Sequence, residues 1–195
     1  MTFEDQKGQT AENVAQVTGI TREEQDRWAV RSQNRTEEAI KNGFFAREIT
    51  PVTLPDGTVI SEDDGPRAGT TYEGISGLKP VFRPDGTVTA GNACPLNDGA
   101  AALVLSNEPL PGAQVPAVRW RSRTHVNEFL PLSRRDPTRF EGAALAWQKG
   151  LASAQRTLGD LQFVETHDCF TIAEMLEYEA MGLAPQGQGA RVILD

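Results

Sequence analysis

The chain has 195 residues, and its 19 Lys and Arg against 27 Asp and Glu give a formal net charge of −8. This acidic balance, with no block of basic residues, argues against a nucleic-acid partner, because phosphate binding needs local positive charge. No apolar run approaches the ~20 residues of a membrane-spanning helix, and the polar, acidic N-terminus is unlike a secretory signal. We therefore expect a cytoplasmic protein built from one domain, or from one domain and part of another.

Two helices are predicted in the first third of the chain. Thr10 can cap a short amphipathic helix that ends near Gly19. Thr21 and Glu24 have the spacing of a capping box, in which each side chain bonds the other residue's backbone N–H, and they predict a helix to about Asn42. The side chains expected on the buried face of this second helix are Trp28, Ala29, Ala39 and Ile40.

A β-hairpin is predicted next. Residues 48–53 and 58–60 are β-prone, and the Pro-Asp-Gly sequence at 55–57 favours a tight turn between them. A short helix over 71–78 and an extended segment at 81–82 should follow.

The second half of the chain alternates between helical and β-like patterns. In chain order we expect a buried strand at 101–105, a Pro- and Gly-rich linker at 107–116, a strand at 118–124, a helix at about 140–157, a strand at 161–165, and a helix that Asp168 can cap and that ends at Gly182. Helices that alternate with strands are typical of an α/β protein.

Cysteine and histidine offer two candidate chemistries. The complete set is Cys94, His125, His167 and Cys169, and a four-ligand zinc site would need every one. His167 and Cys169 are too close in sequence for the usual ligand spacing, so no metal site is expected. A nucleophilic pair of Cys94 with His167 is the alternative, although a lone Cys is more often a small buried hydrophobe. No pattern supports a role for His125.

His167 and Arg67 could also bind a ligand. His167 follows a predicted strand and precedes a predicted helix, where a neutral imidazole can hold a water or an oxyanion, but from these residues alone a structural histidine is the favoured interpretation. Arg67 lies in an acidic loop and is either a solvated charge or a phosphate ligand. The loop at 90–99 contains Gly91 and Gly99, which would let a ligand approach the backbone, or simply form a tight connection.

Four long segments resemble the thiolase family. The segment GTVTAGNACPLNDGAAALVLS (86–106) is similar to the central thiolase signature, and residues 10–52 resemble the helical loop region of these enzymes. Residues 130–151 and 164–190 resemble the sterol-carrier-protein type of thiolase in particular. The resemblance covers almost the whole chain.

The resemblance implies a partial thiolase fold. The family has a duplicated α/β/α/β/α core with a helical loop domain inserted in its first half. By that comparison residues 1–80 are the C-terminal part of the loop domain, residues 81–108 end the N-terminal core half, and residues 109–195 begin the C-terminal half, so both halves are incomplete.

The resemblance also implies a reaction. Thiolases cleave a 3-ketoacyl-CoA with CoA or form it by Claisen condensation, with CoA as a substrate and no separate cofactor. The position of His167 helps to form the oxyanion hole for the enolate through a water, and Arg67 matches an arginine near the CoA nucleotide. The residues that match the lining of the pantetheine and acyl tunnel are Phe82, Ala90, Cys94 and Phe170, and Cys94 is not the family's nucleophile.

Three family motifs are missing from the sequence. The nucleophilic Cys motif is expected upstream of Met1, and the Gly-His-Pro and Cys-x-Gly motifs downstream of Asp195. We therefore expect an internal piece of a thiolase-type acyltransferase that is inactive alone. The alternative is a non-catalytic thiolase-like subunit that binds CoA or a partner chain, and the full-length protein is expected to be a homo-oligomer or to pair with a partner thiolase chain.

Overall fold

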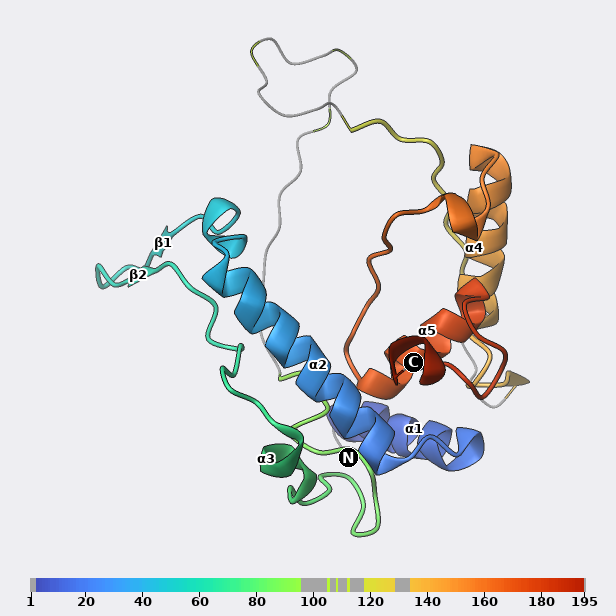
Figure 1. Cartoon of the computed structure of the whole chain (residues 1–195), viewed down its shortest axis with the longest axis horizontal. Coiled ribbons are helices and arrows are strands. Elements are labelled where there is room, and N and C mark those ends of the chain that lie inside the picture. Colours follow the sequence, from blue (N-terminus) through green and yellow to red (C-terminus); the bar gives the residue numbers. More distant parts are fainter. Residues whose placement is uncertain are drawn as a thin grey trace.

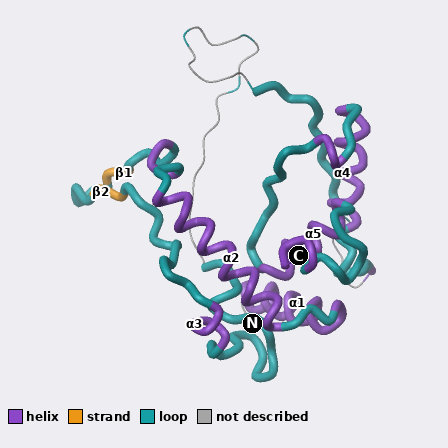
Figure 2. The backbone as a smooth tube through the Cα atoms, in the orientation of Figure 1, coloured by secondary structure: helices purple, strands orange, loops and turns teal. Residues whose placement is uncertain are grey.

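The computed structural model describes residues 3–95, 118–128 and 134–194, together with the single residues 105, 108 and 112. Helices dominate this part of the chain (Figures 1 and 2). The α-helices are α1 (Phe3–Thr18), α2 (Arg22–Lys41), α3 (Tyr72–Ser76), α4 (Glu141–Ala154), α5 (Thr171–Met181) and α6 (Arg191–Leu194). The short 3₁₀ helices are η1 (Phe45–Arg47) and η3 (Leu158–Asp160), and the strands are β1 (Val52–Thr53) and β2 (Val59–Ile60).

Helix α5 contacts α1, α2 and α4, and the main core lies where α5 meets α1 and α2 (Figure 1). The buried apolar cluster draws side chains from α1, α2, α5 and the segment that follows α3. Its members are Ala11, Val14, Ala15, Ile20, Trp28, Val88, Ile172, Met175, Leu176 and Ala190. This core brings residues near 88 beside the start of α5 and thereby positions the candidate site.

Helix α2 and the hairpin follow their predictions closely. The Thr21 side chain accepts a hydrogen bond from the Glu24 N–H, and the Glu24 carboxylate accepts one from the Thr21 N–H at 2.7 Å, so the capping box is formed. Strands β1 and β2 pair antiparallel with Val52 opposite Ile60, and Gly57 in the turn has φ +87°. The prediction for Ile40 is wrong: this side chain is exposed, because the last turns of α2 extend beyond the core.

Two helix starts differ from the sequence predictions. Thr10 lies inside α1, which begins at Phe3, so it is not a cap. Asp168 does not cap α5 either: Phe170 occupies the N-cap position, because an antiparallel bridge between Ala93 and Phe170 keeps the preceding residues extended. Helix α5 ends as predicted at Gly182, which has φ +86°.

The predicted strands at 118–124 and 161–165 are absent from the structure. Strand backbone needs a neighbour to accept its N–H groups and donate to its carbonyls, and the sheet in the described part of the chain consists of β1 and β2 alone. The predicted strand at 101–105 and the linker at 107–116 lie largely outside the described residues.

Gly189 packs directly on the backbone of α5. A Cβ atom at this position would overlap the carbonyl oxygen of Met175, a residue with no exposed surface. We expect Gly189→Ala to lower the free energy of unfolding by about 1–3 kcal/mol, measured by urea denaturation, since backbone cannot give way as a flexible side chain can. The matched control is Gly77→Ala, where an added Cβ meets nothing within 4 Å. Equal stability of the two variants would show that α5 shifts without cost.

Candidate functional site

A short backbone bridge joins two segments that the sequence singled out. Ala93 and Phe170 are antiparallel partners, and the Cys94 N–H donates to the carbonyl oxygen of Cys169 at 3.1 Å. The bridge places Cys94 beside Cys169 and Phe170, which shortly follow His167 in the chain. The structure thus brings Cys94 and Phe170 together and places His167 on the adjoining turn.

Two carboxylates of α5 hold the turn that carries His167. The backbone N–H of His167 donates to Glu177 Oε2 at 3.2 Å, and the hydroxyl of Thr166 donates to Glu174 Oε1. The His167 side chain is exposed. An exposed imidazole on a turn held by its backbone can meet a ligand that approaches from solvent.

Glu174 is a buried carboxylate that the sequence reasoning missed. It is 4% exposed and also accepts a hydrogen bond from the Tyr178 hydroxyl at 2.6 Å. Burial, followed by this bond to Glu174, raises the pKa of Tyr178. The position of Glu174 could have indicated its burial, because it lies between Ile172 and Met175 on the face of α5 that enters the core.

The pKa of the Asp168 carboxyl is raised, first by desolvation and then by the charge of Glu174, while the side chains of Trp28 and Ser32 partly oppose the rise. A raised carboxyl pKa in the folded state means that the folded chain binds more protons than the unfolded chain between the two pKa values. This contribution to stability is therefore fully present below the unfolded pKa and is lost as pH rises through the folded pKa.

Between about pH 4 and pH 7 the wild-type chain should lose this contribution to its free energy of unfolding as Asp168 ionises. We expect the loss to be smaller in Asp168→Asn, because the amide carries no charge to desolvate. Urea denaturation of both proteins across this range measures the effect. The control is Asp56→Asn, since hydrogen bonds from Thr58 lower the pKa of the exposed Asp56 carboxyl and its removal acts in the opposite sense. If the free energy of unfolding of Asp168→Asn changed with pH as that of the wild type does, the assignment would be contradicted.

Two buried carboxylates hold the loop before Cys94. Glu12 of α1 accepts hydrogen bonds from the backbone N–H groups of Thr87 and Val88 at 2.8 to 3.0 Å. Asp26 of α2 accepts from the Asn92 side-chain amide at 2.9 Å, and that amide also donates to the Thr87 carbonyl. The loop that leads to Cys94 is therefore fixed to α1 and α2 by side chains that the sequence reasoning did not select.

Arg67 contacts the same loop. Its guanidinium Nη1 donates to the Ala90 carbonyl at 3.0 Å, and its backbone N–H donates to Gln33 Oε1 at 2.8 Å. The contact places Arg67 and Ala90, both predicted to bind CoA, side by side. Because one bond uses a single N–H of the five in a guanidinium, further donors remain for an anion.

Phe82 lies against α1. Its ring is close enough to Gly8 that an added Cβ would overlap it, and its carbonyl accepts a hydrogen bond from the Gln9 side chain at 2.8 Å. The ring is partly buried and packs on the core cluster. Its role in binding a ligand stays a prediction.

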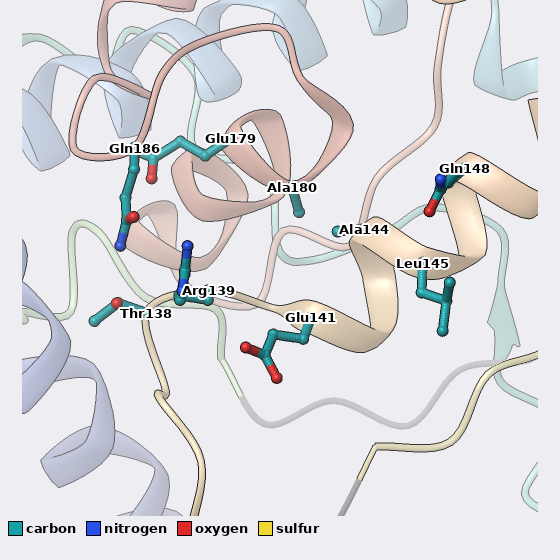
Figure 3. Close-up of a pocket in the computed structure, with 9 residues that line it drawn as sticks. All are labelled: Thr138, Arg139, Glu141, Ala144, Leu145, Gln148, Glu179, Ala180 and Gln186. Atoms are coloured by element: carbon teal, nitrogen blue, oxygen red, sulfur yellow. The ribbon is translucent and has the colours of Figure 1, made fainter.

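A separate pocket opens between α4 and α5 (Figure 3). Its lining comes from the loop before α4, from α4 itself, and from the end of α5 and the loop that follows. The lining residues are Thr138, Arg139, Glu141, Ala144, Leu145, Gln148, Glu179, Ala180 and Gln186. None of the predicted site residues is among them, so this pocket is distinct from the bridge region.

Within the ranges that the structure describes, no group of three or more His, Cys, Asp or Glu side chains could hold a metal ion. His125 is exposed on the segment 118–128. None of the described helices is both long enough and apolar enough to cross a membrane.

Comparison with known families matches nearly the whole chain. The family description "Thiolase, N-terminal domain" matches residues 1–109, and "Thiolase C-terminal domain-like" matches residues 125–195. The chain belongs to the thiolase family. The resemblance seen in the sequence is thereby confirmed.

Similar thiolases include two bacterial proteins. The beta-ketoadipyl-CoA thiolase of Acinetobacter baylyi is 38% identical over 184 residues, which are 92% of this chain and 45% of that protein. The acetyl-CoA acetyltransferase of Escherichia coli is 40% identical over 166 residues, which are 84% of this chain and 41% of that protein. The chain thus spans less than half the length of these thiolases.

A solved thiolase supports the fold as well. The crystal structure of the Bacillus anthracis acetyl-CoA acetyltransferase matches with a TM-score of 0.73 and 34% identity, covering 95% of this chain and 51% of that one. The predicted fold class, a partial α/β thiolase fold, is therefore confirmed, although the described part of this chain is mostly helical.

Proposed function

We propose that this chain is part of a thiolase-type acyltransferase that acts on acyl-CoA, by thiolytic cleavage or by Claisen condensation of a 3-ketoacyl-CoA. The observation that carries the proposal is the Ala93–Phe170 bridge, because it joins the loop before Cys94 to the turn of His167. In the family both segments belong to the substrate site. The names of the similar proteins, which include CoA, support the same substrate class.

The residues take the following roles in this proposal. His167 holds the water of the enolate oxyanion hole, and Arg67 contacts the CoA nucleotide. The tunnel for pantetheine and the acyl group is lined by Phe82, Ala90, Cys94 and Phe170. CoA acts as substrate, and no separate cofactor takes part.

Domain boundaries and cellular context are part of the proposal. Residues 1–80 form the end of the loop domain, residues 81–108 complete the first core half, and residues 109–195 begin the second. The end of one family match at residue 109 supports the second boundary. The full-length protein is a cytoplasmic homo-oligomer or pairs with a partner thiolase chain.

An assay of the purified chain tests its activity. Neither Gly-His-Pro nor Cys-x-Gly occurs in the 195 residues, so we expect no CoA-dependent cleavage of acetoacetyl-CoA above background. Turnover that Cys94→Ala abolishes would overturn the expectation, because it would make Cys94 the nucleophile.

CoA binding tests the substrate class directly. We expect Arg67→Ala to weaken CoA binding about tenfold by calorimetry, since a hydrogen bond to a charged group contributes about 1.5–3 kcal/mol. The control is Arg156→Ala, an exposed arginine after α4. Equal CoA affinity of the two variants would contradict the role of Arg67.

Exposed apolar side chains favour a second candidate, a non-catalytic subunit that pairs with a partner chain. Val118, Trp120 and Phe163 are 98%, 74% and 78% exposed. Contiguous apolar surface is typical of protein interfaces, and Val118 and Trp120 lie close together on one exposed segment. Co-expression with a thiolase chain that supplies the remaining core tests this candidate: a stable complex supports it, and an aggregated chain that no partner rescues contradicts it.

A further inference from the structure

The register of the Ala93–Phe170 bridge sets two cysteines directly opposite each other. In an antiparallel pairing, one step forward from Ala93 and one step back from Phe170 reaches Cys94 and Cys169. The Cys94 N–H donates to the Cys169 carbonyl at 3.1 Å, which is one of the two bonds that a hydrogen-bonded pair of facing residues exchanges. The Cα atoms of such a pair lie about 5.5 Å apart, within the range of about 4.4–6.8 Å that disulfides span.

The two thiols share the face of the bridge that points away from the core. Successive side chains of extended backbone alternate between faces, and Ala93 and Phe170 pack against the core cluster. Cys94 and Cys169 therefore lie on the opposite face, where Cys94 is exposed and Cys169 is partly buried. A small oxidant can reach Cys94 from solvent.

The two thiols differ in reactivity. Burial raises the pKa of the Cys169 thiol, and the neighbouring Cys94 raises it further. Because the thiolate is the reactive form, Cys169 is the slower of the pair to be oxidised directly. Cys94 is therefore the site of first attack, and Cys169 is placed to react with the product.

We propose that Cys94 and Cys169 are a redox pair that closes into an intramolecular disulfide when the chain meets hydrogen peroxide. In the first step the Cys94 thiolate attacks a peroxide oxygen, the O–O bond breaks, and Cys94 sulfenic acid and hydroxide form. In the second step the Cys169 thiolate attacks the Cys94 sulfur and releases the sulfenic oxygen as hydroxide, and the two protons lost by the thiols convert both hydroxides to water. The sum is two thiols and one peroxide giving one disulfide and two waters, and a dithiol reductant reverses it.

The disulfide would fasten the loop before Cys94 to the turn of His167. It would link positions that are 169 − 94 = 75 residues apart in sequence, so it would restrict the unfolded chain strongly. Resting on the proposed function, we infer a second consequence: Cys94 and Phe170 line the pantetheine tunnel, so a covalent bridge there lowers the affinity for CoA.

Mass spectrometry of the intact, purified chain tests the disulfide. Treatment with peroxide, followed by thiol alkylation, should give a monomer that has lost two hydrogens and takes up no alkylating reagent until it is reduced. The chain has two cysteines, so an intramolecular disulfide must join Cys94 and Cys169. The rate at which this disulfide closes tests whether the folded structure holds the two thiols together. We expect closure to be at least about tenfold faster in the native chain than in urea, where a long loop closes rarely.

Single-cysteine variants test the order of the steps. In Cys169→Ala, a cyclic 1,3-diketone should trap the sulfenic acid on Cys94, whereas in Cys94→Ala the remaining Cys169 should be labelled about tenfold more slowly. The oxidised wild type should unfold about 5–10 °C above the reduced form. Disulfide-linked dimers, over-oxidised Cys94 with a free Cys169, or equal closure rates in native buffer and urea would each overturn the proposal.

CoA titration of the reduced and oxidised chain tests the effect of the disulfide on CoA binding separately from the proposed function. At least about tenfold weaker binding to the oxidised form is expected, with binding restored by a dithiol reductant. Equal affinity for both forms would refute the effect on the tunnel. Failure of the reduced chain to bind CoA would contradict the proposed function, and the mass spectrometry would still decide the redox pair.

Discussion

Replacing Asp26 with Ala is expected to lower the free energy of unfolding by about 3–5 kcal/mol, because the change leaves buried partners without their carboxylate. Asp26 has no exposed surface and accepts hydrogen bonds from Arg22 Nε at 2.7 Å and from the Asn92 side chain at 2.9 Å. The Arg22 guanidinium also donates to the carbonyls of Ile75, Ser76 and Leu78 at the end of α3. Urea denaturation measures the loss.

Two further substitutions at this end of α2 make the result specific. Asp26→Asn keeps one oxygen acceptor and should lose less than the Ala variant. Glu23→Ala removes the partner of an exposed ion pair with Arg27 on the same helix and should change stability little. A loss in Asp26→Ala no larger than in Glu23→Ala would mean that the buried network contributes nothing beyond a surface ion pair.

The elements that were predictable from sequence are those whose determinants lie close together along the chain. The capping box of Thr21 and Glu24 fixes the start of α2 over three residues, and the Pro-Asp-Gly turn fixes the hairpin over a similar span. Gly182 ends α5 because its φ of +86° is accessible to glycine at little cost. Such local signals need no tertiary partner to act.

The strand predictions failed because a strand is defined by its neighbours. The alternating pattern at 118–124 and the apolar run at 161–165 describe side chains that suit a sheet, but no described segment pairs with them. Phe163 is consequently 78% exposed. Local patterning cannot supply the partner strand on which the hydrogen bonds of a sheet depend.

The sequence pointed to the residues proposed to face a ligand, whose roles stay predictions, and it did not point to the groups that hold their loops. The resemblance selected Cys94, His167 and Phe170, and the backbone bridge sets Cys94 beside the segment that carries His167 and Phe170. Sequence reasoning passed over Glu12, Asp26 and Glu174, because charged residues on helices are usually solvated and carry no motif. Glu12 nevertheless lies next to Ala11 on the buried side of α1, and both side chains are almost inaccessible to solvent.

The three buried carboxylates Glu12, Asp26 and Glu174 all hold loops in position. Glu12 and Asp26 fix the loop that leads to Cys94, and Glu174 accepts the Thr166 hydroxyl beside His167. Each ties a loop that carries proposed ligand contacts to a helix of the core. Holding such loops by buried acceptors keeps their geometry fixed without filling the space that a ligand would occupy.

Replacing Glu12 with Ala is expected to cost about 3 kcal/mol of unfolding free energy, because backbone N–H groups at Thr87 and Val88 lose their acceptor inside the protein. Glu12 is 3% exposed, and Val88 is 1% exposed. Urea denaturation measures this loss of unfolding free energy. Hydrogen exchange at the Val88 amide should become faster in the variant by the factor that corresponds to the same free energy. A protected Val88 amide in Glu12→Ala would contradict the assignment.

The double variant with Asp26→Ala then tests whether the two carboxylates act on one loop. The Asn92 side chain that Asp26 accepts from also donates to the Thr87 carbonyl and accepts from the Thr89 N–H at 2.8 Å, so the loop should respond as a unit. Once one tie is lost, the other has less ordered structure to hold, and the combined loss should fall short of the sum by about 0.5–3 kcal/mol. Simple additivity would mean that Glu12 and Asp26 anchor the two ends of the loop independently. Each would then stabilise its own end without fixing the position of Cys94.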